Sequence, residues 1–222
     1  ATIMRYMKFD VVTLFPEMFS GFLSESIIKR AIDRKKIEVN LHQLRDFATD
    51  KHKTVDDTPC GGGAGMVLKV DIVDHSISNL KSQILKLRST RTILLVPTGK
   101  RFDQNRAIEL SKYENILLIC GHYEGFDQRV HDHLVDEEIS IGEYVLTGGE
   151  VPAMVVIDAV SRMVSGVIKE ESARNESFMN GKKLDYPVYT KPIEYKGWRV
   201  PEILLSGDHK KINDWRKKDW SK

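Results

Sequence analysis

The sequence predicts an α/β domain with a mainly parallel sheet, followed by a small helical C-terminal domain. Short apolar runs typical of buried strands alternate with segments of helical spacing, which is the pattern of such folds. Three glycine-rich blocks stand after or beside strand-like runs, at 60–66, 120–125 and 140–150. Beyond residue 166 the apolar periodicity disappears, which indicates that the first domain ends there.

Length and composition fit a cytoplasmic globular protein. The chain has 222 residues, of which 41% are hydrophobic and 30% are charged, enough for a core and a polar surface. No apolar run approaches the roughly 20 residues that span a bilayer, and the start of the chain lacks the core of a signal peptide. Two cysteines are too few for a disulfide scaffold. We expect a cytoplasmic location and no membrane partner.

The first half of the chain supplies two strands and two helices. Residues 9–15 form a mostly apolar run, which predicts a buried strand. Residues 17–34 have helical spacing, and residues 37–44 alternate apolar and polar side chains as a half-buried strand does. Residues 46–65 are polar and glycine-rich without periodicity, which predicts a long loop. Helical spacing returns over 70–87.

The second half continues the alternation of strand and helix. Residues 92–96 and 116–120 are continuous apolar runs, as expected of strands covered on both faces. Residues 102–111 between them read as a helix. A short strand over 137–141 leads into the third glycine block, and a helix over 152–164 follows with a proline near its first turn.

The glycine-rich blocks occupy the places where parallel-sheet proteins bind ligands. The turn at 97–99 and the segments 121–125 and 142–149 each follow a strand, and ligands bind beyond the carboxyl ends of strands. The three segments can therefore meet at one rim and hold a ligand through backbone groups. Three unrelated tight turns are the alternative. Neither the dinucleotide fingerprint nor a phosphate-binding loop occurs, which disfavours ordinary NAD or ATP binding.

Histidine and cysteine give weak signals. His131 and His133, with His122 nearby, are expected to be surface or hydrogen-bonding side chains, because no cysteine or carboxylate spacing completes a metal site. Cys60 and Cys120 lack the surroundings of a catalytic nucleophile. We expect both cysteines to be small buried side chains.

Two polar segments carry alternatives that the residues leave open. The net charge of +2 is too small to indicate nucleic acid. The loop at 46–59 is either solvated or an arm that contacts phosphate. The tail from residue 206 is basic and contains Trp215 and Trp220. These tryptophans either stack on bases or pack a helix onto the domain.

Several motifs, taken in order, resemble the bacterial tRNA (guanine-N1)-methyltransferase family over about residues 9–215. Together they are far more specific than any one of them. The motifs are LFPEMF at 14–19, TVDD at 54–57, GGGAGM at 61–66, GHYEG at 121–125, SIGEYVLTGGEVPA at 140–153 and LLSGDH at 204–209.

The resemblance implies a SPOUT-type domain, in which a mainly parallel sheet carries a deep C-terminal trefoil knot. It also implies a homodimer with active sites at the subunit interface. The implied division is a knotted S-adenosylmethionine-binding domain at 1–166, a flexible linker at 167–180, and a small helical tRNA-binding domain at 181–222. Family members usually continue well beyond Trp215, so this last domain is short for the family. Mg²⁺ dependence is implied too, but no carboxylate cluster marks a metal site.

The family's S-adenosylmethionine site falls on the same three loops as the rim. Apolar, backbone-rich loops suit an adenine ring, and Glu124 would either accept from the ribose hydroxyls or lie near the methionyl portion. The resemblance assigns cofactor binding to Leu94, Leu95, Val96, Pro97, Thr98, Gly121, Tyr123, Glu124, Gly125, Ile141, Gly142, Glu143, Tyr144, Val145, Leu146, Gly148, Gly149 and Pro152.

The chemistry accounts for two more polar residues. Guanine N1 carries a proton, so a base must remove it as the ring attacks the methyl group. The family's base is an aspartate just before a Ser-Phe pair, and Glu176 holds that position here, one methylene longer. Arg162 matches the arginine that stabilises negative charge developing towards O6. A helix-surface ion pair is the alternative for Arg162.

The resemblance implies methyl transfer from S-adenosylmethionine to N1 of guanosine 37 of tRNA, just 3′ of the anticodon. A base on a linker suggests that the linker orders only when tRNA and cofactor are both bound. A related SPOUT methyltransferase with another RNA target and a non-catalytic RNA-binding module are the alternatives. A hydrolase using His122 and Glu124 lacks an identified nucleophile.

Overall fold

The computed structural model of the chain describes residues 6–83, 89–169, 177–178, 185–218 and 220. The chain divides into two compact units between residues 168 and 169. Among the described residues, no helix is long and apolar enough to cross a membrane.

The first unit is built on a five-stranded, all-parallel sheet, which confirms the predicted class. The strands, in the spatial order β2-β1-β6-β5-β7, are β2 (Ile37–Gln43), β1 (Met7–Thr13), β6 (Asn115–Cys120), β5 (Thr90–Arg101) and β7 (Glu137–Ser140). Phe9 of β1 lies opposite Val39 on one side and Ile116 on the other. All residues of central β6 are buried, as expected of a strand covered on both faces.

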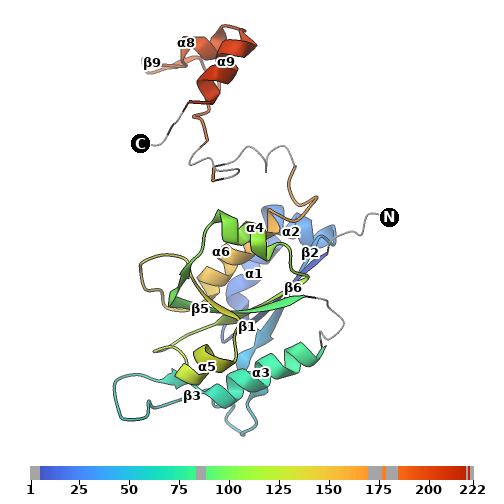
Figure 1. Cartoon of the computed structure of the whole chain (residues 1–222), viewed down its shortest axis with the longest axis vertical. Coiled ribbons are helices and arrows are strands. Elements are labelled where there is room, and N and C mark those ends of the chain that lie inside the picture. The colour runs from blue at the N-terminus through green and yellow to red at the C-terminus, as the bar shows by residue number, and fades with distance from the viewer. Residues whose placement is uncertain (1–5, 84–88, 170–176, 179–184, 219, 221–222) are drawn as a thin grey trace. The chain divides into compact units, whose positions relative to one another are not determined.

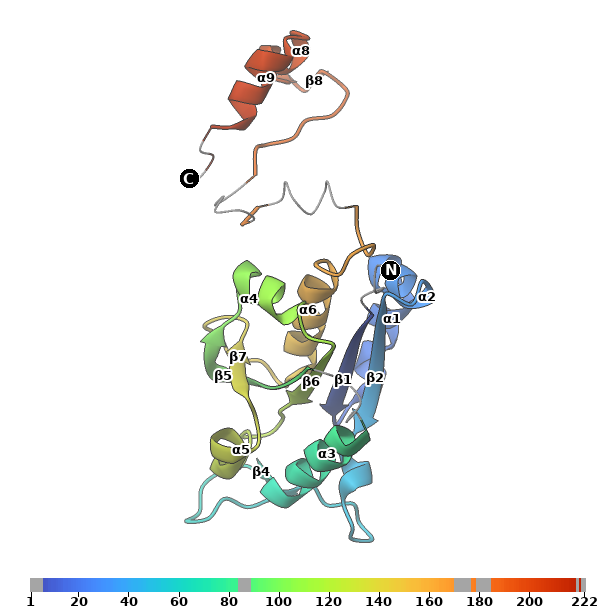
Figure 2. The same ribbon diagram turned by 45° about the vertical axis from the view of Figure 1, so that its right-hand side comes forward.

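Helices cover both faces of this sheet (Figure 1 and Figure 2). On one face lie α1 (Ser20–Ser24), α2 (Ser26–Asp33), α4 (Gln104–Leu110) and α6 (Glu150–Ser161), and on the other lie α3 (Val70–Gln83) and α5 (Gln128–His133). Successive strand residues point to opposite faces, so Leu95 joins the core under α6 and Leu94 the core under α3. Each fully buried side chain of this size contributes about 1.5–3 kcal/mol.

The helix predicted over 17–34 is interrupted. It divides into the 3₁₀ turn η1 (Pro16–Phe19) and the helices α1 and α2. Glu25 between them is extended, with φ −130° and ψ 159°, and Ser26 has φ 53°. Neither conformation continues a helix. Ile28 of α2 still lies in the core. The apolar residues of the predicted helix are therefore buried as expected, although the helix itself is not continuous.

Strand β5 runs past the point where the sequence predicted a turn. The strand was expected to stop before Pro97, yet it reaches Arg101. Leu95 and Lys100 both lie opposite Ile139 of β7, so the register shifts between them and the intervening residues bulge out. A proline is tolerated there because the bulge requires no ladder hydrogen bond from it.

Several short elements lie outside the sequence predictions. They are the 3₁₀ turn η2 (Leu44–Phe47), helix α5, and the antiparallel hairpin of β3 (Asp56–Asp57) and β4 (Val67–Leu68). Elements of two to six residues are too short to show an apolar period. The hairpin spans part of the loop expected over 46–65 and projects the first glycine block from its tip.

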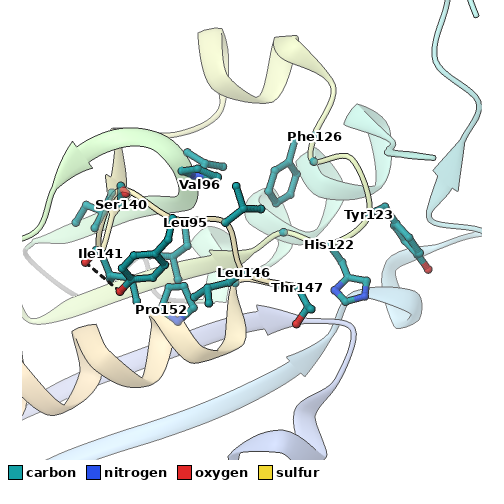
Figure 3. A pocket seen from close by; sticks show the side chains of 18 of the residues that line it. Leu95, Val96, His122, Tyr123, Phe126, Ser140, Ile141, Leu146, Thr147 and Pro152 are labelled. Atoms are coloured by element: carbon teal, nitrogen blue, oxygen red, sulfur yellow. Dashed lines mark hydrogen bonds between the residues drawn. The ribbon is translucent and has the colours of Figure 1, made fainter. Parts of the chain in front are cut away.

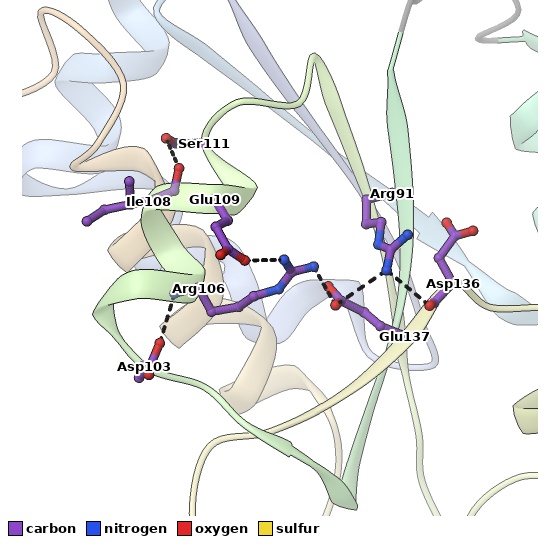
Figure 4. Close-up of polar contacts among 8 residues, drawn as sticks. All are labelled: Arg91, Asp103, Arg106, Ile108, Glu109, Ser111, Asp136 and Glu137. Carbon is purple, nitrogen blue, oxygen red and sulfur yellow. Dashed lines mark hydrogen bonds and ion pairs between the residues drawn. The ribbon is translucent and has the colours of Figure 1, made fainter.

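Charged side chains join α4 to the edge of the sheet (Figure 4). The Arg106 guanidinium donates to carboxylates of Glu137 on β7 and Glu109 on α4. Arg91 of β5 donates to the Asp136 carbonyl at 3.2 Å and lies 3.7 Å from the Glu137 carboxylate. Glu137 is therefore shared by two arginines, which ties three elements together.

A buried carboxylate stabilises the other edge of the sheet. Asp10 of β1 is 1% exposed, and its Oδ1 lies 2.9 Å from His42 Nε2 on β2. Lys8 Nζ lies 3.2 Å from Asp10 Oδ2. Burial opposes ionisation, but the hydrogen bond with His42 and the charge of Lys8 outweigh it and hold the pKa of Asp10 below its ordinary 3.8.

We expect Asp10 to make stability depend on pH in acid. A carboxyl whose pKa is lower when folded stabilises the fold above its unfolded pKa, and this is lost as the pH falls through the folded pKa. The difference in unfolding free energy between the native chain and Asp10→Asn should therefore shrink as the pH is lowered below 3.8. Denaturant unfolding at several pH values measures it. Asp33→Asn, which removes an exposed ion pair with Lys29, is the control. A difference that stays constant with pH would contradict this role.

The second unit contains a hairpin and two short helices. These are β8 (Glu194–Tyr195), β9 (Trp198–Arg199), α8 (Glu202–Leu205) and α9 (His209–Arg216). Trp215 of α9 lies between Tyr186 and Trp220, with ring centroids 6.4 Å and 4.7 Å away. Trp215 therefore takes part in packing within this unit.

Candidate functional site

A cavity of about 230 Å³ lies beside the bulge of β5, at the carboxyl ends of β6 and β7 (Figure 3). Its walls come from residues 95–97, 121–126, 139–142 and 144–149, together with Pro152 at the start of α6. This confirms that the three predicted segments meet at one rim and excludes three unrelated turns.

Most residues expected to bind the cofactor line this cavity. Three of them do not: Leu94, Thr98 and Glu143. Leu94 is fully buried on the opposite face of the sheet. The side chain of Glu143 is 93% exposed and lies 3.8 Å from that of Arg101, and Thr98 lies in the bulge of β5. Neighbouring residues of the segments that line the cavity therefore do not all contribute to its wall.

The cavity also has lining residues that the cofactor assignment did not include. These are His122, Phe126, Ile139, Ser140 and Thr147. His122, Ser140 and Thr147 stand inside glycine-rich blocks, so inclusion of every residue in each block would have found them. Phe126 and Ile139 lie outside the blocks and required knowledge of the loop after β6 and of strand β7.

The walls combine apolar side chains with backbone groups. Leu95, Ile141, Leu146 and Pro152 supply apolar surface around the opening (Figure 3). The Tyr144 hydroxyl donates to the Ile141 carbonyl at 3.4 Å, which folds the third loop on itself. Such walls suit a flat apolar ring whose polar edge bonds to the main chain.

Gly149 allows helix α6 to start directly against the end of β6. Its N–H donates to the Gly121 carbonyl at 2.8 Å. A Cβ at this position would stand 2.7 Å from Cys120 Cα and 2.8 Å from Gly121 N, both backbone atoms that cannot yield cheaply. The start of α6 and the end of β6, which both form walls of the cavity, can therefore approach each other closely only because residue 149 is glycine.

Glu150 lies buried behind these walls. It is 2% exposed, and its carboxylate accepts from the Thr13 hydroxyl at 2.7 Å. Its place in the first turn of α6 is favourable for a negative charge. Burial, and secondly the charge of Glu150, raise the pKa of the Cys120 thiol well above its ordinary range. Cys120 is therefore an inert core side chain, as expected.

The loop after β6 carries an aromatic and histidine cluster. The ring of His122 lies 5.0 Å from Phe15 and 5.1 Å from Tyr123, in edge-on geometry. Tyr123 has φ 60°, and its hydroxyl accepts from Arg45 at 3.4 Å. Arg45 thereby joins the polar segment after β2 to the rim of the cavity.

Of the two predicted catalytic residues, Arg162 does not line the cavity of its own chain. Arg162 follows the last turn of α6, whereas Pro152 at the first turn lines the cavity. Ten residues of α-helix span about 15 Å, so Arg162 stands at the far end of the helix. Glu176 lies outside the described residues.

Of the remaining predictions for histidine and cysteine, one is confirmed and one is wrong. His131 Nδ1 lies 3.0 Å from Glu138 Oε1, which confirms a hydrogen-bonding role. Cys60 is exposed, so the prediction that it is buried was wrong, because the hairpin tip that carries it projects from the core. In the described part of the chain, no group of three His, Cys, Asp or Glu side chains could hold a metal ion.

Comparison with known proteins decides the family. A family profile described as tRNA (Guanine-1)-methyltransferase TrmD matches residues 7–222. The chain belongs to this family. Proteins named tRNA (guanine-N(1)-)-methyltransferase from Citrifermentans bemidjiense and Mycoplasmopsis synoviae are 53% and 52% identical to it. Each alignment covers 96% of this chain, and they cover 84% and 91% of the relatives.

A solved structure supports the same assignment. The tRNA (m1G37) methyltransferase of Aquifex aeolicus is 42% identical, with a TM-score of 0.78. The match covers 95% of this chain and 87% of that one. The resemblance seen in the sequence motifs is thereby confirmed, and with it the enzyme class, a methyltransferase.

Proposed function

We propose that this chain transfers a methyl group from S-adenosylmethionine to N1 of guanosine 37 of tRNA. The observation that carries the proposal is the cavity at the rim, lined by the same glycine-rich loops that carry the family's motifs. The likeness to a tRNA (m1G37) methyltransferase supports the position of the target guanosine. The absence of a spanning helix in the described residues is in keeping with a cytoplasmic location.

The residues of the cavity fit S-adenosylmethionine. Leu95, Ile141 and Leu146 offer apolar surface for the adenine ring. Glycines in the same loops keep main-chain groups accessible to the polar edge of that ring. Glu124 lines the cavity, and its carboxylate can accept hydrogen bonds from hydroxyl or ammonium groups of the ligand. When bound there, the cofactor supplies the electrophilic methyl group.

Two side chains act on the guanine base: one removes a proton and the other stabilises negative charge. Glu176 removes the proton from N1, so that the nitrogen lone pair becomes available for attack. Arg162 stabilises the negative charge that moves to O6 as this proton leaves. Glu176 stands on a linker that we expect to order when tRNA and cofactor are both present, which would exclude water from the site. Equal hydrogen-exchange protection of residues 167–180 with and without both ligands would contradict this closure.

We further propose that the active site is shared between two copies of the chain. Arg162 stands about 15 Å along α6 from the cavity, too far to act there within its own subunit. Apolar side chains are exposed on α6 and the segments beside it: Phe15, Met18, Tyr144, Val145, Leu146, Val151 and Val155. An exposed apolar surface of this kind marks a protein interface. A homodimer would cover it and bring Arg162 of one copy to the cavity of the other.

A charged residue introduced into this exposed apolar surface should separate the dimer into monomers. We expect Val155→Asp to give a monomer that loses methyl transfer, because a carboxylate at the interface would be buried without a partner. Sedimentation and methyl-transfer assays measure both effects. Val188→Asp places the same charge at another exposed valine, in the second unit, and should change neither. A dimeric Val155→Asp variant, or an active monomer, would contradict the shared site.

Trefoil knotting of the first unit is part of the proposal. The likeness to the family supports it. The bulge at 96–99 would be one of the loops of the knot.

A panel of purified RNAs tests the function. We expect label from methyl-labelled S-adenosylmethionine in a tRNA transcript with guanosine at position 37, and none in the same transcript with adenosine there. Label in ribosomal RNA instead would favour a related methyltransferase with another target. Binding of cofactor without label in any RNA would favour a non-catalytic binding module.

A further inference from the structure

Backbone hydrogen bonds join the first glycine block to the cavity. The block lies between the strands of the β3–β4 hairpin. Glu124 N–H donates to the Met66 carbonyl at 3.0 Å, and Leu68 N–H donates to the Gly125 carbonyl at 2.9 Å. Asp127 N–H donates to the Leu68 carbonyl at 3.1 Å. The end of the glycine block is therefore held against the loop that carries Glu124.

Gly65 lies directly under the Glu124 side chain. A Cβ at position 65 would stand 2.8 Å from the carboxyl carbon of Glu124 and 2.5 Å from its Oε1. The φ of Gly65 is +82°, in the region that favours glycine. Among the described residues, no hydrogen bond or ion pair holds the Glu124 carboxylate. Its direction therefore depends on the surface that it packs against.

We propose that Gly65 is a positioning residue for Glu124. The missing side chain lets Glu124 fold back over the backbone of the glycine block, which sets where its carboxylate stands at the cavity. Any side chain at position 65 would push that carboxylate away from its place. The inference rests on the proposed cofactor site, to which Glu124 belongs, and it assigns a role to a glycine that does not itself line the cavity.

The same glycine block supplies a matched control. Gly62 has φ +86°, and a Cβ there would meet nothing within 4 Å. Gly62→Ala and Gly65→Ala therefore impose similar backbone strain, but only the second displaces Glu124. A difference between the two variants reports the contact with Glu124 rather than the general cost of alanine at positive φ.

A double-mutant cycle tests the inference. The Kd for S-adenosylmethionine would be measured by calorimetry on the native chain, Gly62→Ala, Gly65→Ala, Glu124→Ala and the Gly65→Ala/Glu124→Ala double variant. We expect Gly65→Ala to weaken binding roughly 10- to 100-fold more than Gly62→Ala, the range for a lost hydrogen bond to a charged group. In the Glu124→Ala background, Gly65→Ala should add no more than Gly62→Ala does alone. Melting temperatures would verify that each variant is folded.

Each other outcome overturns the inference in a recognisable way. Equal weakening by Gly65→Ala in both backgrounds would mean that Gly65 acts without Glu124. If Gly62→Ala and Gly65→Ala weakened cofactor binding equally, backbone strain alone would explain the effect of Gly65→Ala. Native binding that Glu124→Ala leaves unchanged would remove Glu124 from the cofactor site while the site itself stands. A folded native chain that does not bind S-adenosylmethionine would overturn the proposed function as well.

Discussion

Glu176→Gln is expected to lower the rate of methyl transfer about 10²- to 10⁴-fold, the range for loss of a general base. Glutamine keeps the size of the side chain but cannot take the N1 proton. Because every described residue that lines the cavity is unchanged, affinity for S-adenosylmethionine should stay close to native. Single-turnover methylation of tRNA at saturating substrate, together with calorimetry for the cofactor, measures both quantities.

Two further variants make this result specific. Glu171→Gln removes a carboxylate from the same polar segment and should keep the native rate. Glu176→Asp restores the family's residue at this position and should remain active. A near-native rate of methyl transfer in Glu176→Gln would show that another group is the general base.

Gly149→Ala is expected to damage the cavity itself. The new Cβ would stand 2.7 Å from Cys120 Cα, so the start of α6 and the end of β6 must move apart. Overpacking of this kind costs about 1–3 kcal/mol of stability. Since both segments are cavity walls, we expect affinity for S-adenosylmethionine to fall at least about tenfold as well. Melting temperature and calorimetry report the two effects.

Gly142→Ala is the matched comparison for Gly149→Ala. Its Cβ would meet the ring of Tyr144, 2.8 Å from Cζ, and that side chain is 55% exposed. A flexible side chain can swing away, whereas backbone cannot. Gly142→Ala should therefore lower stability less than Gly149→Ala. Native stability and cofactor affinity in Gly149→Ala would show that the walls are more adaptable than their contacts indicate.

The sheet and the rim could be predicted because their signals are local. The apolar run at 116–120 marks β6, a fully buried strand, and the glycines that follow mark a loop that needs close approach. Parallel strands end at one edge, so the order of strands and glycine blocks was sufficient to bring three loops together.

The errors arose where tertiary contacts override local pattern. Nothing in the apolar spacing reveals the extended backbone at Glu25 that divides α1 from α2. The register shift that carries β5 past Pro97 depends on pairing with Ile139, a residue distant in sequence. The assignment of Leu94 together with its neighbours did not foresee that strand alternation turns its side chain into the opposite core.

The contact between Gly65 and Glu124 belongs to the same class of long-range information. Gly65 and Glu124 belong to separate family motifs, and no spacing rule relates them. Only the approach of the β3–β4 hairpin to the loop after β6 places one over the other.

Mapping the methylated atom in tRNA tests the central claim most directly. The native chain would be incubated with S-adenosylmethionine and a tRNA transcript that has guanosine at positions 36 and 37, and the product would be digested and analysed by mass spectrometry. We predict N1-methylguanosine at nucleotide 37 and no other methylated base. A chain that binds S-adenosylmethionine yet methylates another position, another atom or no nucleotide of this tRNA would contradict the proposed function.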